Sequence, residues 1–126
     1  MKYISTRGQA PDLAFDDVLL TGLARDGGLY VPDAWPRFDT ADLKALAGLS
    51  YADCAFRIIR PFTAGTIAED DLAAIVAATY ANFDHADVAP LKSLGNNEWL
   101  MELFHGPTLA FKDYAMQFLG HMFDHV

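Results

Sequence analysis

The stretch ELFHGPTLAFKDYAMQF, residues 102–118, carries the change from a turn-rich segment to an apolar helix. Pro107 and Thr108 favour a turn and a helix cap. Apolar residues then recur at helical spacing, which predicts a helix over residues 110–126. Lys112 falls in the first turn of this predicted helix. A solvated surface lysine needs no such setting, so the position of Lys112 is the feature to explain.

The predicted helix start gives Lys112 two possible roles. A helix N-terminus carries partial positive charge and disfavours another cation, so burial by Phe111 and the adjoining apolar face would favour the neutral amine. A neutral lysine amine is a nucleophile and forms a Schiff base with an aldehyde. Alternatively, Lys112 is solvated and pairs with Asp113 or Glu102. The spacing alone does not separate these two interpretations.

The segments before this helix predict a helix-rich region with short strands. Residues 90–94 and 98–104 are strand-like, and Gly95, Asn96 and Asn97 supply turn chemistry, so a β-hairpin is expected. Gly27 and Gly28 are expected to end the first helix, and Pro61 the third. Asp39 or Thr40 is expected to cap the start of the second helix. Ser50 and Asp53 form a capping-box-like start of the third helix, and Thr66 and Glu69 repeat this signature before the fourth. The chain is thus predicted to be α/β. The expected helices are 15–28, 39–49, 50–62 and 70–83, and the expected short strands are 2–6 and 29–32.

Composition excludes several classes of function. The chain has 126 residues, a net charge of −8 and 52% hydrophobic residues, so it can build one modest core. The negative charge argues against a nucleic-acid or acidic-membrane surface. We find no signal peptide and no membrane-spanning run, which makes the cytoplasm the expected compartment. Cys54 is the only cysteine and is expected to be a buried thiol, while no histidine joins it at metal-ligand spacing, so no metal site is expected.

Two blocks of the sequence resemble one family. ELFHGPTLAFKD (102–113) is similar to the signature around the cofactor lysine of threonine synthases, which are pyridoxal-phosphate enzymes of the tryptophan-synthase-β-like class. YISTRG (3–8) and LLTGLARDGGLYVP (19–32) independently resemble the N-terminal domain of the longer, bacterial and fungal type. The resemblance implies a division into a threonine synthase N-terminal domain (1–88) and the first segment of the cofactor-binding catalytic domain (89–126). That segment would be the hairpin and the lysine-bearing helix that begin a pyridoxal-phosphate domain of fold type II.

The resemblance also implies a reaction. Pyridoxal 5′-phosphate would form a Schiff base with Lys112, and O-phospho-L-homoserine would displace the lysine. The freed amine of Lys112 would then act as general base and acid, while the cofactor serves as the electron sink. Water and O-phospho-L-homoserine would give L-threonine and phosphate, which makes the enzyme a carbon–oxygen lyase acting on phosphates.

Neighbouring residues are weaker candidates, and each has a structural alternative. Phe111 and Asp113 are candidate cofactor contacts, although packing and the helix dipole would also account for them. Thr108 and His105 are candidate substrate contacts, or else an N-cap and a loop histidine bonded to backbone. Arg7 is a candidate anion contact, or one half of a surface salt bridge.

Parts of the family's active site have no match in this sequence. None of its nine glycines builds the phosphate-cradling loop, and the group that binds the pyridine nitrogen is also missing. We therefore expect an N-terminal fragment that is inactive alone and self-associates through the apolar face of its last helix. The alternatives are another fold type II enzyme, either phospholyase-like or a threonine dehydratase, and a non-catalytic module derived from the family. The DGGLYVP block argues against the dehydratase, and the retained HGPTLAFKD string argues against the module.

Overall fold

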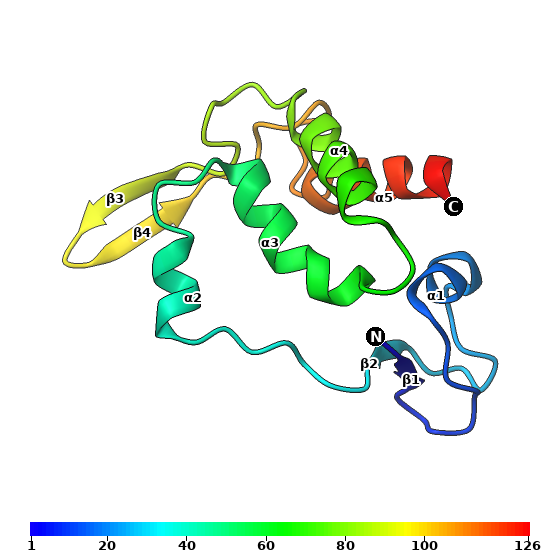
Figure 1. Ribbon diagram of the computed structural model, residues 1–126. Coiled ribbons are helices and arrows are strands. Elements are labelled where there is room, and N and C mark those ends of the chain that lie inside the picture. Colours follow the sequence, from blue (N-terminus) through cyan, green and yellow to red (C-terminus); the bar gives the residue numbers. More distant parts are fainter.

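The computed structural model describes all residues 1–126 and is a mixed structure of helices and short strands (Figure 1). This confirms the α/β prediction at the level of fold class. The strands form two separate two-stranded antiparallel sheets, β1–β2 and β3–β4. The elements in chain order are β1 Tyr3–Ser5, α1 Phe15–Thr21, β2 Tyr30–Pro32, α2 Thr40–Ala45, α3 Tyr51–Thr63, α4 Glu69–Tyr80, β3 Leu91–Gly95, β4 Glu98–Met101 and α5 Asp113–His125.

The β1–β2 sheet and α1 form the N-terminal end of the molecule, at the lower right of Figure 1. Ile4 pairs with Val31 in the middle of the sheet. The prediction that Gly27 and Gly28 end the first helix was wrong, because α1 already ends at Gly22, whose φ of 69° is a left-handed value. Gly27, with φ 77°, belongs instead to the turn that leads into β2.

The core lies between α3, α4 and α5. Leu72 and Val76 on α4 and Met122 on α5 are each only 1% exposed and form one cluster with Ile67. Residues from α1 and α3 pack against this cluster, and α4 contacts both α3 and α5 (Figure 1). The apolar stripe predicted for the last helix is therefore partly covered within the chain.

The predicted starts of α2 and α3 were confirmed, whereas the predicted end of α3 and the predicted capping pair of α4 were wrong. Asp39 caps α2 in a complete capping box, and Ser50 caps α3. Pro61, however, does not end α3, which continues to Thr63; because Pro61 lies in the last turn, its missing N–H removes a single helical hydrogen bond. The capping pair predicted at the start of α4 is also absent, since the hydroxyl of Thr66 donates to the carbonyl of Thr63.

The predicted hairpin is present as β3 and β4, and it extends to the left in Figure 1. Asn96 and Asn97 form its turn with positive φ angles of 49° and 61°. All nine residues of the two strands are exposed. The second strand ends at Met101 rather than at residue 104, and just beyond it the side chain of Glu102 bonds to the ring of His105.

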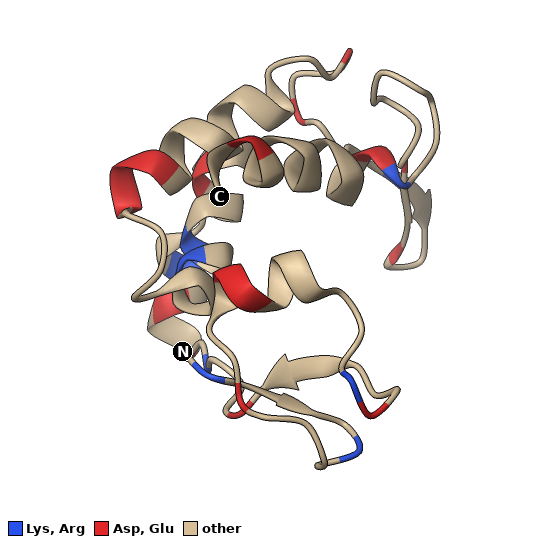
Figure 2. Ribbon diagram, turned by 90° about the vertical axis from the view of Figure 1, so that its right-hand side faces the viewer, with Lys and Arg blue, Asp and Glu red and all other residues tan.

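Acidic residues are spread along the chain, as the red segments of the ribbon in Figure 2 show. Glu69, Asp70 and Asp71 form the first turn of α4, where their charge complements the helix dipole. None of the helices has the length and apolar character that crossing a membrane requires.

Candidate active site

Lys112 lies immediately before α5, as the N-cap residue of that helix. Its carbonyl accepts a hydrogen bond from the N–H of Met116 at 2.9 Å, which fixes its backbone at the helix start. Its side chain is exposed and takes part in none of the ion pairs, so the pairing with Asp113 or Glu102 does not occur. The expected burial by Phe111 is also absent, because Phe111 is itself 67% exposed.

Asp113 is buried beside the exposed lysine, at 3% exposure. Its carboxylate accepts hydrogen bonds from the backbone N–H of Thr108 (2.8 Å), the hydroxyl of Thr108 (2.9 Å) and the side-chain amide of Gln117 (3.2 Å). Burial raises the pKa of Asp113, but the hydrogen bonds from Thr108 and Gln117 outweigh it and hold the pKa below its usual range. Thr108 is therefore a partner of Asp113 and not the N-cap of α5.

His105 is held by a carboxylate and not by backbone. One ring nitrogen of His105, Nε2, lies 2.9 Å from Oε2 of Glu102, and both side chains are largely buried. The rings of Phe104 and His85 lie on it, with centroids 4.7 and 5.0 Å away. The backbone carbonyl of His105 accepts from the N–H of Asp84. These contacts fix the entry to the turn.

An apolar groove of about 650 Å³ opens beside Lys112. Its walls come from the start of α3, the hairpin strands and the first turn of α5. Lys112 and Phe111 line it, whereas Asp113, Thr108, His105 and Arg7 do not. The other lining residues are Tyr51, Ala89, Leu91, Met101, Leu103, Tyr114, Ala115 and Met116.

Three tyrosines support one wall of the groove. The hydroxyl of Tyr114 donates to the carbonyl of Val88 at 2.7 Å, and the hydroxyl of Tyr80 donates to the carbonyl of Tyr114 at 3.0 Å. The rings of Tyr51 and Tyr80 are edge-to-face with centroids 4.8 Å apart. Burial, followed by the neighbouring Tyr51, raises the pKa of Tyr80 to about 12. These side chains join α3, α4 and α5 behind the groove.

Sequence reasoning missed these wall residues. Tyr114 lies two positions after Lys112, and that proximity could have marked it as a candidate. Tyr51, Leu91 and Met101 carry no local signal, because only the packing of distant segments brings them to Lys112.

Arg7 serves the N-terminal sheet. One guanidinium nitrogen donates to the carbonyl of Asp26 at 2.9 Å, so the predicted surface salt bridge is replaced by a bond to backbone. The side chain of Asp26 organises the same region, because it accepts from the hydroxyl of Ser5 and from the N–H groups of Gln9 and Gly28. Burial raises the pKa of Asp26, but these hydrogen bonds outweigh it and hold the pKa below its usual range.

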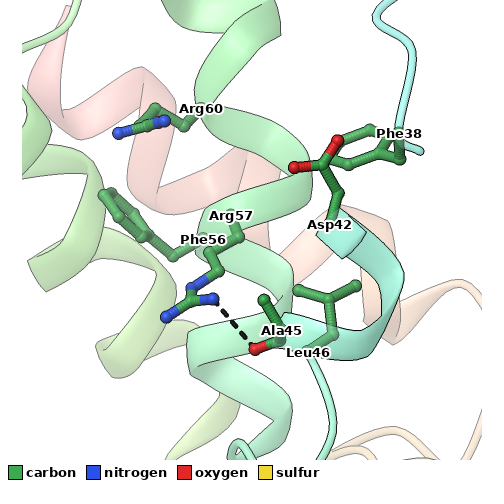
Figure 3. Close-up of a pocket in the computed structure, with 7 residues that line it drawn as sticks. All are labelled: Phe38, Asp42, Ala45, Leu46, Phe56, Arg57 and Arg60. Carbon is green, nitrogen blue, oxygen red and sulfur yellow. Dashed lines mark hydrogen bonds between the residues drawn. The ribbon is translucent and has the colours of Figure 1, made fainter. Parts of the chain in front are cut away.

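A second cavity, of about 360 Å³, lies between α2 and α3 (Figure 3). Two guanidinium groups line it. That of Arg57 donates to the carbonyl of Ala45 at 3.0 Å, and that of Arg60 pairs with Glu69 at 3.4 Å. Both cations therefore already have protein partners. No group of three or more histidine, cysteine, aspartate or glutamate side chains is placed to hold a metal ion.

Comparisons with known proteins identify the family of this chain. The family described as "Threonine synthase N terminus" matches residues 2–80, well over half of the chain. The chain belongs to the threonine synthase family. The threonine synthase of Pseudomonas aeruginosa is 60% identical over 126 residues, which are 100% of this chain and 27% of that protein.

Solved threonine synthases share the fold of this chain. The structure of threonine synthase from Brucella melitensis with bound PLP is 52% identical, has a TM-score of 0.97, and is matched over 99% of this chain and 27% of its own. Threonine synthase from yeast is 40% identical with a TM-score of 0.89, over 98% of this chain and 26% of its own. The chain thus spans about a quarter of the length of the threonine synthases it matches.

Proposed function

We propose that this chain is the N-terminal part of a pyridoxal-phosphate-dependent threonine synthase, in which Lys112 binds the cofactor. The observation that carries the proposal is the exposed, unpaired side chain of Lys112 at an apolar groove, in a chain 60% identical to a threonine synthase. The full enzyme converts O-phospho-L-homoserine and water into L-threonine and phosphate. Its location is the cytoplasm, and its substrate is a small molecule.

The groove fits part of the cofactor. Its volume of about 650 Å³ and its aromatic walls, Phe111, Tyr51 and Tyr114, suit a flat pyridine ring. Lys112 lies at the same groove and offers a primary amine to the aldehyde. The lining supplies no cluster of backbone N–H groups for a phosphate, so the proposal assigns phosphate binding to residues outside this chain.

The residues of this chain have distinct roles in the proposed reaction. Pyridoxal phosphate, when bound, supplies an electron sink for charge that develops at the substrate Cα. Lys112 would hold the cofactor through its aldehyde carbon, and its amine would move the proton at Cα of the substrate. Tyr51 and Tyr114 hold the groove wall. Phe111 would offer apolar surface to the cofactor ring.

The proposal also covers the organisation of the chain. Residues 1–88 form the N-terminal domain, which the family match to residues 2–80 supports. Residues 89–126 form the first segment of the cofactor domain of fold type II. The 126 residues alone neither bind the cofactor tightly nor turn over substrate. They self-associate through the exposed side of α5, where Met116 and Phe123 are 59% and 48% exposed.

The test uses the full-length protein. Pyridoxal phosphate is added, the adduct is reduced with borohydride, and the modified lysine is located by peptide mass spectrometry. We expect a pyridoxyl group on Lys112 in the parent and in the control Lys92→Ala, whose lysine is exposed on β3, and its loss from Lys112 in Lys112→Ala. Modification of another lysine, or of none, would refute the proposal.

Product analysis separates the synthase from related enzymes. With O-phospho-L-homoserine as substrate, the parent should form L-threonine and phosphate in equal amounts. Phosphate without threonine would indicate a phospholyase-like enzyme, and breakdown of added threonine would indicate a dehydratase.

A further inference from the structure

The side chain of Asp113 does not line the groove, although Asp113 adjoins the lysine. Both of its oxygens accept hydrogen bonds from Thr108, and one also accepts from Gln117. Because those acceptors are committed and the residue is 3% exposed, the carboxylate is not available to a ligand in the groove. The role of Asp113 must therefore come from the backbone segment that its hydrogen bonds fix.

The contacts of Asp113 close a turn around the lysine. Thr108 and Asp113 are five positions apart, and the residues between them are 109–112, the last of which is Lys112. Within this turn the N–H of Leu109 donates to the carbonyl of Gly106, and the N–H of Asp113 donates to the carbonyl of Ala110, both at 3.0 Å. The carboxylate thus joins the two ends of the segment that presents the lysine.

The turn needs such a link, because it contains an unfavourable backbone conformation. Leu109 has a φ of 62°, a left-handed value that a leucine rarely adopts. The side chain of Leu109 is 67% exposed, so its own burial does not offset the cost. The hydrogen bonds from Thr108 to Asp113 hold this conformation from outside.

Gly106 gives the carboxylate room to reach the turn. A Cβ atom at position 106 would lie 2.5 Å from the Cβ and 2.6 Å from the Oδ2 of Asp113. Such distances are far below van der Waals contact. The glycine is therefore required for space, and the turn and the first residue of α5 fit together as one unit.

We propose that Asp113 is a positioning residue that locks the turn 106–112 and thereby directs the amine of Lys112 to the groove. This rests on the proposed function of Lys112. In this arrangement the backbone of Lys112 is held on one side by the linked turn and on the other by the hydrogen bond from Met116. Its long side chain stays free to move between cofactor and substrate.

The test compares variants of the full-length protein. Thr108→Val removes one hydrogen bond to Asp113 with little change of shape, Thr108→Ser restores the hydroxyl, and Asp113→Asn alters the acceptor itself. Asp26→Asn is the matched control, because Asp26 also accepts from a hydroxyl and from backbone N–H groups, but in the β1–β2 region. For each variant we would measure amide hydrogen exchange of residues 106–112, pyridoxal phosphate affinity, kcat and KM.

We expect faster exchange in the turn and a fall in kcat on the order of 10- to 100-fold for Thr108→Val and Asp113→Asn, with KM little changed. Thr108→Ser should recover most of the loss. Asp26→Asn should lower the melting temperature without changing exchange in the turn or cofactor affinity. If Thr108 contacted substrate instead, KM would rise and exchange would stay as in the parent.

Three further results would overturn the proposal. Suppose that Asp113→Asn and Thr108→Val both keep the exchange and the kcat of the parent while Lys112 still carries the cofactor. This result would refute the positioning role of Asp113 and leave the proposed function intact. Equal losses in Asp26→Asn would show a general loss of folding instead of positioning. A parent protein with no pyridoxyl group on Lys112 would overturn both this proposal and the proposed function.

Discussion

At the scale of single residues, two neighbouring side chains have opposite environments. Lys112 is exposed and unpaired, whereas Asp113 is buried and accepts three hydrogen bonds. The residue proposed for chemistry, Lys112, is therefore directly followed by the residue proposed to hold the backbone of the turn, Asp113. Gly106 belongs to the second group, because its missing side chain leaves the space that Asp113 fills.

Gly106→Ala should destabilise the 126-residue chain by about 1–3 kcal/mol, because the new methyl group overlaps the side chain of Asp113. Gly120→Ala is the control: it lies in α5 with no atom within 4 Å of the added carbon, and it should stabilise by about 0.5–1 kcal/mol. Urea unfolding of both variants would measure the difference. Equal stability of Gly106→Ala and the parent would show that the turn can move aside.

At the scale of elements, the sequence predicts whether a segment is a helix or a strand better than it predicts the residues at which that element begins and ends. Asp39 and Ser50 mark helix starts correctly, because a cap depends on residues within one turn. The prediction from Pro61 was wrong, because a proline in the last turn of a helix removes only one helical hydrogen bond. The capping pattern at Thr66 failed for a similar reason, since its hydroxyl found the nearer carbonyl of Thr63.

The candidate site follows the same division. Lys112 was predicted from local sequence and from the family resemblance that it carries. The groove wall from Tyr51 was not predicted, because it depends on how distant segments come together. The bond between Thr108 and Asp113 was not predicted either, although the two residues are only five positions apart, because each of them also had a simpler local role at the start of the helix. The expected burial of Lys112 by Phe111 was wrong, because both side chains are exposed.

The packing of α5 on α4 can be tested with two methionines of one helix. Met122 is 1% exposed in the core, and Met116 is 59% exposed. Met122→Ala should cost about 2–5 kcal/mol of unfolding free energy, because it leaves a cavity between the helices. Met116→Ala should change it by no more than about 0.5 kcal/mol. Similar urea midpoints for the two variants would mean that α5 does not belong to this core.

At the scale of the whole molecule, the aromatic cluster ties three helices together. Tyr51 comes from α3, Tyr80 from α4 and Tyr114 from α5, and Phe83 packs between the last two. The phenol of Tyr80 must stay protonated to donate to the carbonyl of Tyr114. Ionisation of the Tyr80 phenol would therefore remove this hydrogen bond and lower the free energy of unfolding of the packed helices.

Alkaline pH should weaken the fold through Tyr80. Its pKa is raised from 10.0 to about 12, so between these values the unfolded chain releases a proton that the folded chain keeps. The contribution of Tyr80 is complete below pH 10 and is lost as the pH rises toward about 12. Tyr80→Phe should show a flatter fall in urea midpoint over this window than the parent.

A control for the alkaline experiment is Tyr30→Phe, which removes a hydroxyl from β2 that bonds only to the carbonyl of Pro11. It should retain the slope of the parent. A parental slope in Tyr80→Phe would show that another group governs the alkaline loss.

The core also sets an order of events during synthesis. Leu72 and Val76 leave the ribosome long before Met122, yet all three share one buried cluster. Until residue 122 has emerged, the side of the α3–α4 core that α5 covers in the finished fold remains exposed to water. Translation thus delays the completion of this core by about 50 residues, on the order of several seconds at 5–20 residues per second. During that interval the nascent chain offers an apolar surface to chaperones that the finished fold conceals.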